Sequence, residues 1–323
     1  MQTVIRTEKL TKRFGALVAV DGLDLEVREG EVFGFLGPNG AGKTTTLRLL
    51  CALIGPTSGT AEVAGYRLGQ QDSEIRAAVG ILTEQPGLYE RQSAWDNLVF
   101  FATLYGLDRT TAARQAEHFL RLMGLWDRRL EAVATFSRGM KQKMAIARAA
   151  LHEPRVLFLD EPTTGLDPDA AKTVREFIGA VRGEGRTVFL CTHNLDEADR
   201  LCDRIAFFRQ SVIRIDTPDH LRAELYGHAT EIRLMPRPRA EDLVRVQAVH
   251  GVREAHLENG SIIVSAPDPL RTNPLLVRAL VDGGAQIAYV IERKVHLEEV
   301  YLSIVEGSGP PRRSRDVGQG RPT

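Results

Sequence analysis

Eight residues near the start of the chain have the spacing of a loop that binds phosphate groups. Residues 37–44 are Gly-Pro-Asn-Gly-Ala-Gly-Lys-Thr, which matches the pattern G-x-x-x-x-G-K-[ST]. The glycines allow a curled backbone whose N–H groups point at phosphate oxygens, and a helix expected to begin near Lys43 adds the positive end of its dipole. An apolar run typical of a strand, Glu31–Leu36, comes directly before the pattern. We therefore predict a nucleotide-phosphate site rather than a glycine-rich turn.

The residue types of this loop assign roles to its members. Lys43 is expected to bridge the β- and γ-phosphates of the nucleotide, and Thr44 is expected to hold Mg²⁺. The remaining residues of the expected nucleotide-binding segment are Gly37, Pro38, Asn39, Gly40, Ala41, Gly42 and Thr45. A nucleotide and Mg²⁺ are thus the predicted ligands of this loop.

Two carboxylates follow a second apolar run. Asp160 and Glu161 come directly after Val156–Leu159, at the end of an expected strand. In isolation such a pair is more often a helix N-cap or a solvated turn. Behind a phosphate loop, Asp160 is expected near Mg²⁺ through a water molecule, and Glu161 is expected to polarise the water that attacks the γ-phosphate.

The elements that must position these residues alternate between strand and helix patterns. Runs expected to be strands are Thr3–Ile5, Leu23–Val27, Glu31–Leu36, Val156–Leu159 and Thr187–Thr192. Runs with helical spacing are Lys43–Ile54, Gln92–Tyr105, Thr110–Met123, Met140–Leu151 and Asp169–Arg182. This pattern predicts an α/β domain of the P-loop NTPase type over residues 1–227, with buried parallel strands.

A different pattern over residues 228–306 predicts a second, smaller domain. Its expected elements, in order, are a strand at Ala229–Met235, a helix at Ala240–Val249, strands at Val252–Glu258 and Ser261–Ala266, a helix at Pro269–Asp282 and a strand at Gln286–Glu292. The pair Asn259-Gly260 is typical of a two-residue hairpin turn. The order β-α-β-β-α-β is that of a ferredoxin-like α+β fold. A further helix is expected at His296–Val305, and a disordered tail at 307–323.

Composition limits the possible function classes. The chain has 323 residues, with 42 Lys and Arg against 42 Asp and Glu, so its net charge of zero argues against nucleic acid as a partner. Its three cysteines lack any C-x-x-C spacing, which favours a reducing, cytosolic compartment. The sequence shows neither a signal peptide nor a long apolar run. If the chain takes part in transport, we expect another polypeptide to form the pore.

Taken together, these motifs resemble the nucleotide-binding domain of ATP-binding-cassette transporters, including its antiparallel β and helical subdomains. The resemblance implies that ATP and Mg²⁺ are the cofactors, that Phe14 stacks on adenine, that Gln85 contacts Mg²⁺ and the attacking water, and that His193 contacts the γ-phosphate. It also implies that the loop ending at Asp167 crosses between two subunits. His193 follows an expected parallel strand, at the sheet edge where α/β proteins bind ligands.

The family's signature motif, Leu-Ser-Gly-Gly-Gln, is altered in this chain to residues 136–140, Phe-Ser-Arg-Gly-Met. Ser137 and Gly139 are retained, and they are expected to hold the γ-phosphate of a nucleotide bound to the other subunit. Arg138 restricts a backbone that glycine would leave free, and Met140 lacks the amide of glutamine. Similar variants occur among bacterial exporter subunits, and the C-terminal region resembles the accessory domain of daunorubicin-resistance-type subunits.

The resemblance implies an ATPase that powers a separate integral membrane permease, more in keeping with an exporter than an importer. Its expected location is the cytoplasmic, inner face of the cell membrane, as a homodimer or with a paralogous ATPase subunit. The alternatives are an importer subunit with a regulatory C-terminal domain, or a non-transport ATPase of translation or DNA maintenance. Against the latter, the chain has one phosphate loop and no coiled-coil insertion. The GTPase pattern Asn-Lys-x-Asp does not occur.

Overall fold

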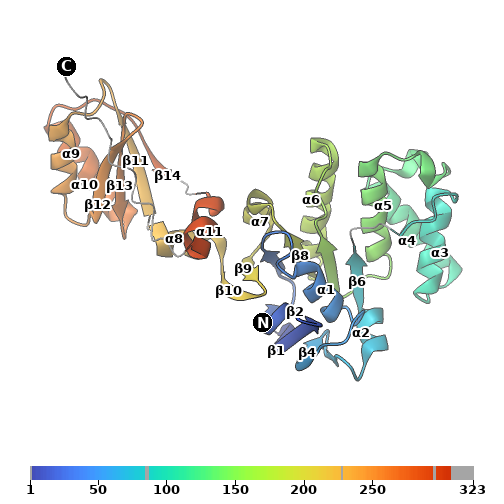
Figure 1. Ribbon diagram of the computed structural model, residues 1–323. Coiled ribbons are helices and arrows are strands. Elements are labelled where there is room, and N and C mark those ends of the chain that lie inside the picture. Colours follow the sequence, from blue (N-terminus) through green and yellow to red (C-terminus); the bar gives the residue numbers. More distant parts are fainter. Residues whose placement is uncertain (1, 84–86, 227, 294–295, 307–323) are drawn as a thin grey trace, which may run out of the picture. The chain divides into compact units, whose positions relative to one another are not determined.

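The computed structural model describes residues 2–83, 87–226, 228–293 and 296–306 (Figure 1). The chain divides into two compact units, Met1–Thr217 and Pro218–Thr323. The second unit begins before residue 227, where the sequence pattern changes, because helix α8 (Pro218–Tyr226) contacts α11 (Leu297–Glu306) and β11 (His228–Leu234). The expected disordered tail, 307–323, lies outside the described residues.

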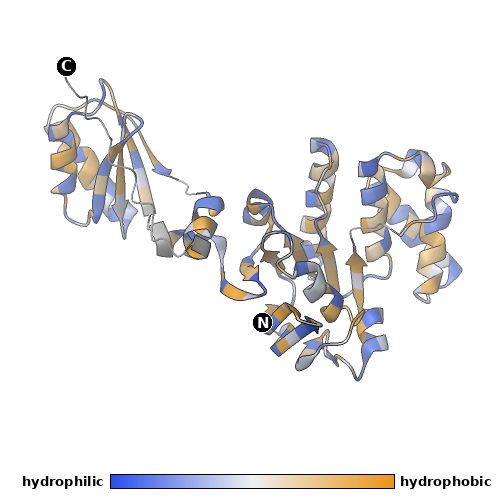
Figure 2. Ribbon diagram, viewed as in Figure 1, coloured by the Kyte–Doolittle hydropathy of each residue, from blue (hydrophilic) through white to orange (hydrophobic). Residues whose placement is uncertain are grey.

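A six-stranded sheet forms the centre of the first unit, in the order β10-β9-β3-β8-β7-β6. Its strands are β3 (Val32–Leu36), β6 (Val79–Leu82), β7 (Val156–Asp160), β8 (Thr187–Thr192), β9 (Arg204–Arg209) and β10 (Ser211–Asp216). Neighbouring strands from β9 to β6 run parallel, whereas β10 runs antiparallel to β9. Every residue of β3, β7 and β8 is buried, and Figure 2 shows the hydrophobic character of this sheet. The predicted buried parallel strands are confirmed.

A second sheet of the first unit is antiparallel, in the order β2-β1-β4-β5. Its strands are β1 (Thr3–Phe14), β2 (Leu17–Arg28), β4 (Ser58–Val63) and β5 (Tyr66–Arg67). The strands predicted near the N-terminus were too short. The pairing of β1 with β2 shifts register in several places, and Lys9 has a positive φ of 47°, so the alternating pattern is interrupted while pairing continues.

Helices surround these sheets, namely α1 (Lys43–Leu50), α2 (Asp72–Ala78), α3 (Ala94–Leu104), α4 (Arg109–Leu122), α5 (Arg138–Ala150), α6 (Pro168–Gly183) and α7 (Leu195–Leu201). Helix α1 ends earlier than the predicted Ile54 because Ala52 adopts a positive φ of 52°. Its buried leucines share one hydrophobic core with both sheets, which fixes the loop that precedes it. Helices α3, α4 and α5 contact one another and form a helical group, which α5 joins to β6 and β7 of the central sheet (Figure 1).

The second unit contains a four-stranded antiparallel sheet in the order β12-β13-β11-β14. Its further elements are α9 (Ala240–Gln247), β12 (Glu254–Glu258), β13 (Ser261–Ala266), α10 (Pro269–Asp282) and β14 (Ile287–Arg293). Residues of both helices pack with the strands in one core. Asn259 and Gly260 have φ of 49° and 81°, as a two-residue hairpin requires. The order of elements is that of the predicted ferredoxin-like fold.

None of the helices that the structure describes is both long and apolar enough to cross a membrane.

Candidate active site

The loop between β3 and α1 can be built only with glycine at two positions. A Cβ atom on Gly42, whose φ is 104°, would lie 2.1 Å from the carbonyl oxygen of Ala19. A Cβ atom on Gly37 would lie 2.1 Å from the carbonyl oxygen of Phe208. Gly40 also has a positive φ, 77°, but faces open space. The backbone is therefore curled tightly against its neighbours, as a phosphate-binding loop requires.

Lys43 directs its ammonium group back over this loop. The residue is only 6% exposed, and Nζ donates hydrogen bonds to the carbonyl oxygens of Gly37 and Pro38 at 2.6 and 3.3 Å. The same Nζ lies 3.6 Å from Oε1 of Glu161. A buried cation thus connects the phosphate loop to the carboxylates at the end of β7.

The first of these carboxylates pairs with the hydroxyl of Thr44. Thr44 Oγ1 donates to Asp160 Oδ2 at 2.7 Å, and Asp160 is 5% exposed. Hydroxyl and carboxylate oxygens are ligands that Mg²⁺ prefers. Among the described residues no group of three or more His, Cys, Asp or Glu could hold a metal by itself. The pair therefore suits a magnesium ion that receives its other ligands from nucleotide and water.

Besides Lys43, three neighbours at or near the carboxyl ends of the central strands hold Glu161. Its backbone has a positive φ of 50°, which is strained for a residue other than glycine, and its N–H donates to the carbonyl oxygen of Cys191 at 2.9 Å. Its Oε1 lies 2.8 Å from Nδ1 of His193, and its Oε2 accepts from Thr164 Oγ1 at 2.9 Å. The structure thus brings together Lys43, Glu161 and His193.

The residues of the altered signature motif form a second cluster. Ser137 caps α5 by accepting from the N–H of Met140 at 3.3 Å. A Cβ atom on Gly139 would lie 3.4 Å from Oδ2 of Asp167, and Asp167 caps α6 by accepting from Ala170 N at 2.8 Å. The N-termini of α5 and α6 therefore lie together. These hydrogen bonds of Ser137 and Asp167 cap their own helices and do not involve the phosphate loop.

Two further predicted residues are Phe14, which belongs to neither cluster, and Gln85. Phe14, at the end of β1, is 50% exposed, and Nζ of Lys12 lies 5.1 Å from the centroid of its ring. A half-exposed aromatic ring at the end of this strand can stack on a planar base. Gln85 lies outside the described residues.

Sequence reasoning missed several residues that lie close to Glu161, His193 or the altered signature motif. Thr164 donates to Glu161, and the guanidinium of Arg138 donates to the carbonyl oxygen of Thr164 at 3.3 Å. Glu197, on α7, is a buried carboxyl at the back of the turn that carries His193. The only sequence feature that could have indicated Glu197 is an acidic residue four positions after the histidine, in the first turn of a helix.

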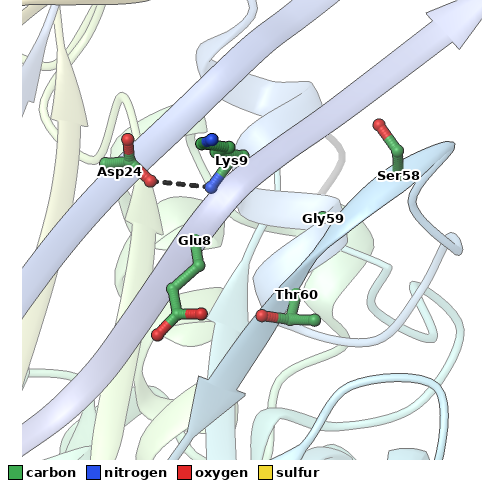
Figure 3. A pocket seen from close by; sticks show the side chains of 6 residues that line it. All are labelled: Glu8, Lys9, Asp24, Ser58, Gly59 and Thr60. Carbon is green, nitrogen blue, oxygen red and sulfur yellow. Dashed lines mark hydrogen bonds between the residues drawn. The ribbon is translucent and has the colours of Figure 1, made fainter.

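A surface hollow lies elsewhere, on the antiparallel sheet (Figure 3). It is lined by Glu8, Lys9, Asp24, Ser58, Gly59 and Thr60. All six residues are exposed, and the backbone N–H of Lys9 donates to Asp24 Oδ1 at 2.7 Å. The hollow follows from the irregular pairing of β1, because Gly59 approaches the carbonyl oxygen of Lys9 so closely that a Cβ atom would lie 2.2 Å from it. None of the predicted site residues lines it.

Comparison with known proteins identifies the family. A family model described as ABC transporter matches residues 20–164. A daunorubicin resistance ATP-binding protein of Streptomyces coeruleorubidus is 36% identical over 318 residues, which cover 98% of this chain and 99% of that protein. The chain belongs to the ABC transporter family. The bacitracin transport ATP-binding protein of Bacillus licheniformis is 34% identical over 95% of this ABC protein and 99% of its own length.

Solved structures agree with this assignment. A structure titled as the ATP binding subunit of an ABC transporter superposes with a TM-score of 0.65 at 32% identity, over 70% of this chain and 94% of that one. A dimeric ATP-binding cassette bound to ADP and phosphate has a TM-score of 0.61 at 24% identity, over 66% and 98% of the two chains, and shows the same fold. This ABC protein is therefore an ATP-binding subunit with ATPase activity, as the sequence predicted.

Proposed function

We propose that this ATPase powers a separate membrane permease that exports a drug-like or antibiotic molecule. The observation that carries the proposal is the extent of the match to resistance proteins. The daunorubicin resistance relative aligns over 98% of this chain, so the resemblance includes the second unit as well as the ATPase unit. The bacitracin transport relative aligns over 95%. The partner would be an integral membrane protein, with the ATPase bound at its cytoplasmic face.

In the proposed reaction, the triphosphate of ATP lies along the loop at residues 37–44. Lys43 exchanges its hydrogen bonds to loop carbonyls for the β- and γ-phosphates. Thr44 would hold Mg²⁺ directly and Asp160 would hold it through a water molecule, and the ion would neutralise phosphate charge. Phe14 would stack on the adenine, and Gln85, on the resemblance to the family, would help to hold the metal and orient the attacking water.

Hydrolysis itself is assigned to Glu161 and His193. Glu161 accepts a proton from the water that attacks the γ-phosphorus, and the bond from that phosphorus to the bridging oxygen breaks to release ADP and phosphate. His193 contacts the γ-phosphate. Nδ1 of His193 lies 2.8 Å from Oε1 of Glu161. This short distance supports the assignment, because both side chains could then reach the same γ-phosphate.

We further propose that two ATPase subunits, identical or paralogous, close around two ATP molecules. Ser137 and Gly139 of one subunit would hold the γ-phosphate bound to the other, and Asp167 would lie in the loop that crosses between them. The N-terminus of α5 favours this role, since its free N–H groups and dipole attract anions. A dimeric assembly is known for the cassette bound to ADP and phosphate, which shares the fold.

The test is transport in inverted membrane vesicles that contain this chain together with a candidate integral membrane permease. Vesicles with the wild-type pair should accumulate daunorubicin or bacitracin when supplied with ATP and Mg²⁺. Vesicles with Glu161→Gln in the same pair, which should bind ATP without turnover, serve as the matched control. Fractionation of the chain wholly with ribosomes or DNA, and never with membranes, would contradict the proposal.

A further inference from the structure

A buried carboxyl group lies behind the turn that carries His193. Glu197 belongs to α7 and is only 4% exposed, although carboxylates are rarely buried without a specific partner. It touches no predicted site residue by a hydrogen bond. Its contacts are instead with residues on either side of His193 and with the segment that follows Glu161.

Three hydrogen bonds form a closed ring around the backbone of His193. The N–H of Glu197 donates to Asn194 Oδ1 at 3.1 Å, and the N–H of Asn194 donates to Thr192 Oγ1 at 3.0 Å. Thr192 Oγ1 in turn donates to Glu197 Oε2 at 3.4 Å. His193 is the one residue between Thr192 and Asn194, so the ring fixes the direction in which its side chain leaves the sheet.

The second oxygen of the carboxyl group is enclosed by protein. Oε1 of Glu197 is buried and has no hydrogen-bond partner of regular geometry among the described residues, although Thr163 is close enough to lower the pKa of the carboxyl. Thr163 lies between Glu161 and Thr164, which donates to Glu161. The carboxyl of Glu197 therefore bonds to the segment that carries His193 and lies near the segment that carries Glu161.

We propose that Glu197 is a positioning residue for ATP hydrolysis: its carboxyl closes the ring of residues 192, 194 and 197 and so holds His193 against Glu161. The inference rests on the proposed roles of these two residues. It adds a residue that acts through His193 and does not itself touch the nucleotide.

The electrostatic surroundings of Glu197 are consistent with this role. Burial raises the pKa of its carboxyl above the ordinary value, whereas Thr163 and the nearby charge of Arg175 lower it. The negative charge of Glu161 raises it further. Since the shape and the acceptor oxygen matter in the ring, a neutral isostere should serve nearly as well as the carboxyl.

The experiment compares Glu197→Ala, Glu197→Gln and Thr192→Val in steady-state ATP hydrolysis, with ATP binding and Tm measured in parallel. Glu197→Ala and Thr192→Val should each lower kcat by about tenfold, the effect of one lost hydrogen bond to a positioned group, with KM for ATP unchanged. Glu197→Gln should restore kcat to nearly the wild-type value. The double variant Thr192→Val, Glu197→Ala should be no slower than the single ones, since both break one ring.

Asp196→Ala is the matched control, because Asp196 is an exposed carboxylate on the same turn of α7 and should leave kcat unchanged. An unchanged kcat in Glu197→Ala would overturn the inference. So would a fall in ATP affinity as large as the fall in kcat, accompanied by a lower Tm, since that pattern indicates general disruption of the fold. If Glu197→Ala does not fold, Thr192→Val and Glu197→Gln still decide it. The variant His193→Ala distinguishes failure of the role proposed for His193 from failure of the role proposed for Glu197. Full turnover in His193→Ala would refute the role of His193 itself.

Discussion

Nδ1 of His193 lies 2.8 Å from Oε1 of Glu161, although the two residues are far apart in the sequence. Glu161 directly follows strand β7, and His193 directly follows strand β8. These strands are parallel neighbours, and their register pairs Asp160 with Cys191. The N–H of Glu161 continues this pairing by donating to the carbonyl oxygen of Cys191. The register of two buried strands thus sets the separation of the two side chains, without help from any long loop.

Glu161→Gln should stop turnover while leaving ATP binding intact. The amide keeps the shape of the side chain but cannot accept a proton from water, so kcat should fall by at least about 100-fold, the usual contribution of a general base. Turnover is measured by phosphate release and binding by equilibrium titration of ATP. An undiminished rate would refute the assignment of the base.

Thr44→Val should weaken ATP binding only when Mg²⁺ is present. Valine keeps the volume of threonine but removes the hydroxyl that now donates to Asp160 at 2.7 Å. We expect a loss of about tenfold in affinity for ATP with Mg²⁺, as for one lost polar contact to a charged group. Titrations with and without EDTA make the comparison, and equal losses under both conditions would contradict the role of Thr44 at the metal.

Gly42→Ala should destabilise the first unit far more than Gly40→Ala. Both glycines have positive φ, so each alanine variant carries backbone strain of about 1 kcal/mol or more. Only at Gly42 would the new Cβ atom also lie 2.1 Å from a backbone oxygen, whereas Gly40 faces open space. Urea unfolding followed by circular dichroism measures the difference. Similar midpoints for the two variants would show that the loop can relax around residue 42.

His152 should make stability depend on pH in the mildly acidic range. Burial lowers its pKa from the ordinary 6.5 to about 4, and the nearby charge of Arg186 lowers it too. The unfolded chain therefore takes up a proton at this residue below pH 6.5, whereas the native protein does not until about pH 4. Stability from this source is complete above pH 6.5 and is lost as the pH falls towards 4.

The matched variant is His152→Phe, which retains an aromatic ring against Tyr105, the ring that stacks on His152 at 3.8 Å. Its Tm should differ from that of the wild type by a constant amount above pH 6.5. Between pH 6.5 and 4 the wild type should lose Tm relative to the variant. Parallel Tm curves over that whole range would contradict the assignment.

Much of the fold followed from local patterns in the sequence. Buried strands such as Thr187–Thr192 are continuous apolar runs whose ends are unambiguous, and Asn259-Gly260 fixes a hairpin by its own backbone preference. The first strands were predicted too short because irregular pairing at Lys9 interrupts their alternation. Such pairing depends on a partner strand distant in sequence, which a local pattern does not contain.

The site divides in the same way. The glycine spacing around Lys43 is a local feature, and the carboxylates after β7 could be assigned a role because that loop precedes them. Thr164 and Glu197 were missed because only tertiary contacts bring them close to Glu161 and His193. A threonine after a carboxylate pair, or a glutamate in the first turn of a helix, has many ordinary explanations.

The arginine that alters the signature motif ties together two loops of one subunit. Arg138 donates to the carbonyl oxygen of Thr164, its guanidinium lies against Gly165, and Thr164 donates to Glu161. Glycine at position 138 could make no such side-chain contact. Two hydrogen bonds in series therefore form a short mechanical linkage from the start of α5 to the carboxylate beside Lys43, so a displacement at one end must be accommodated at the other.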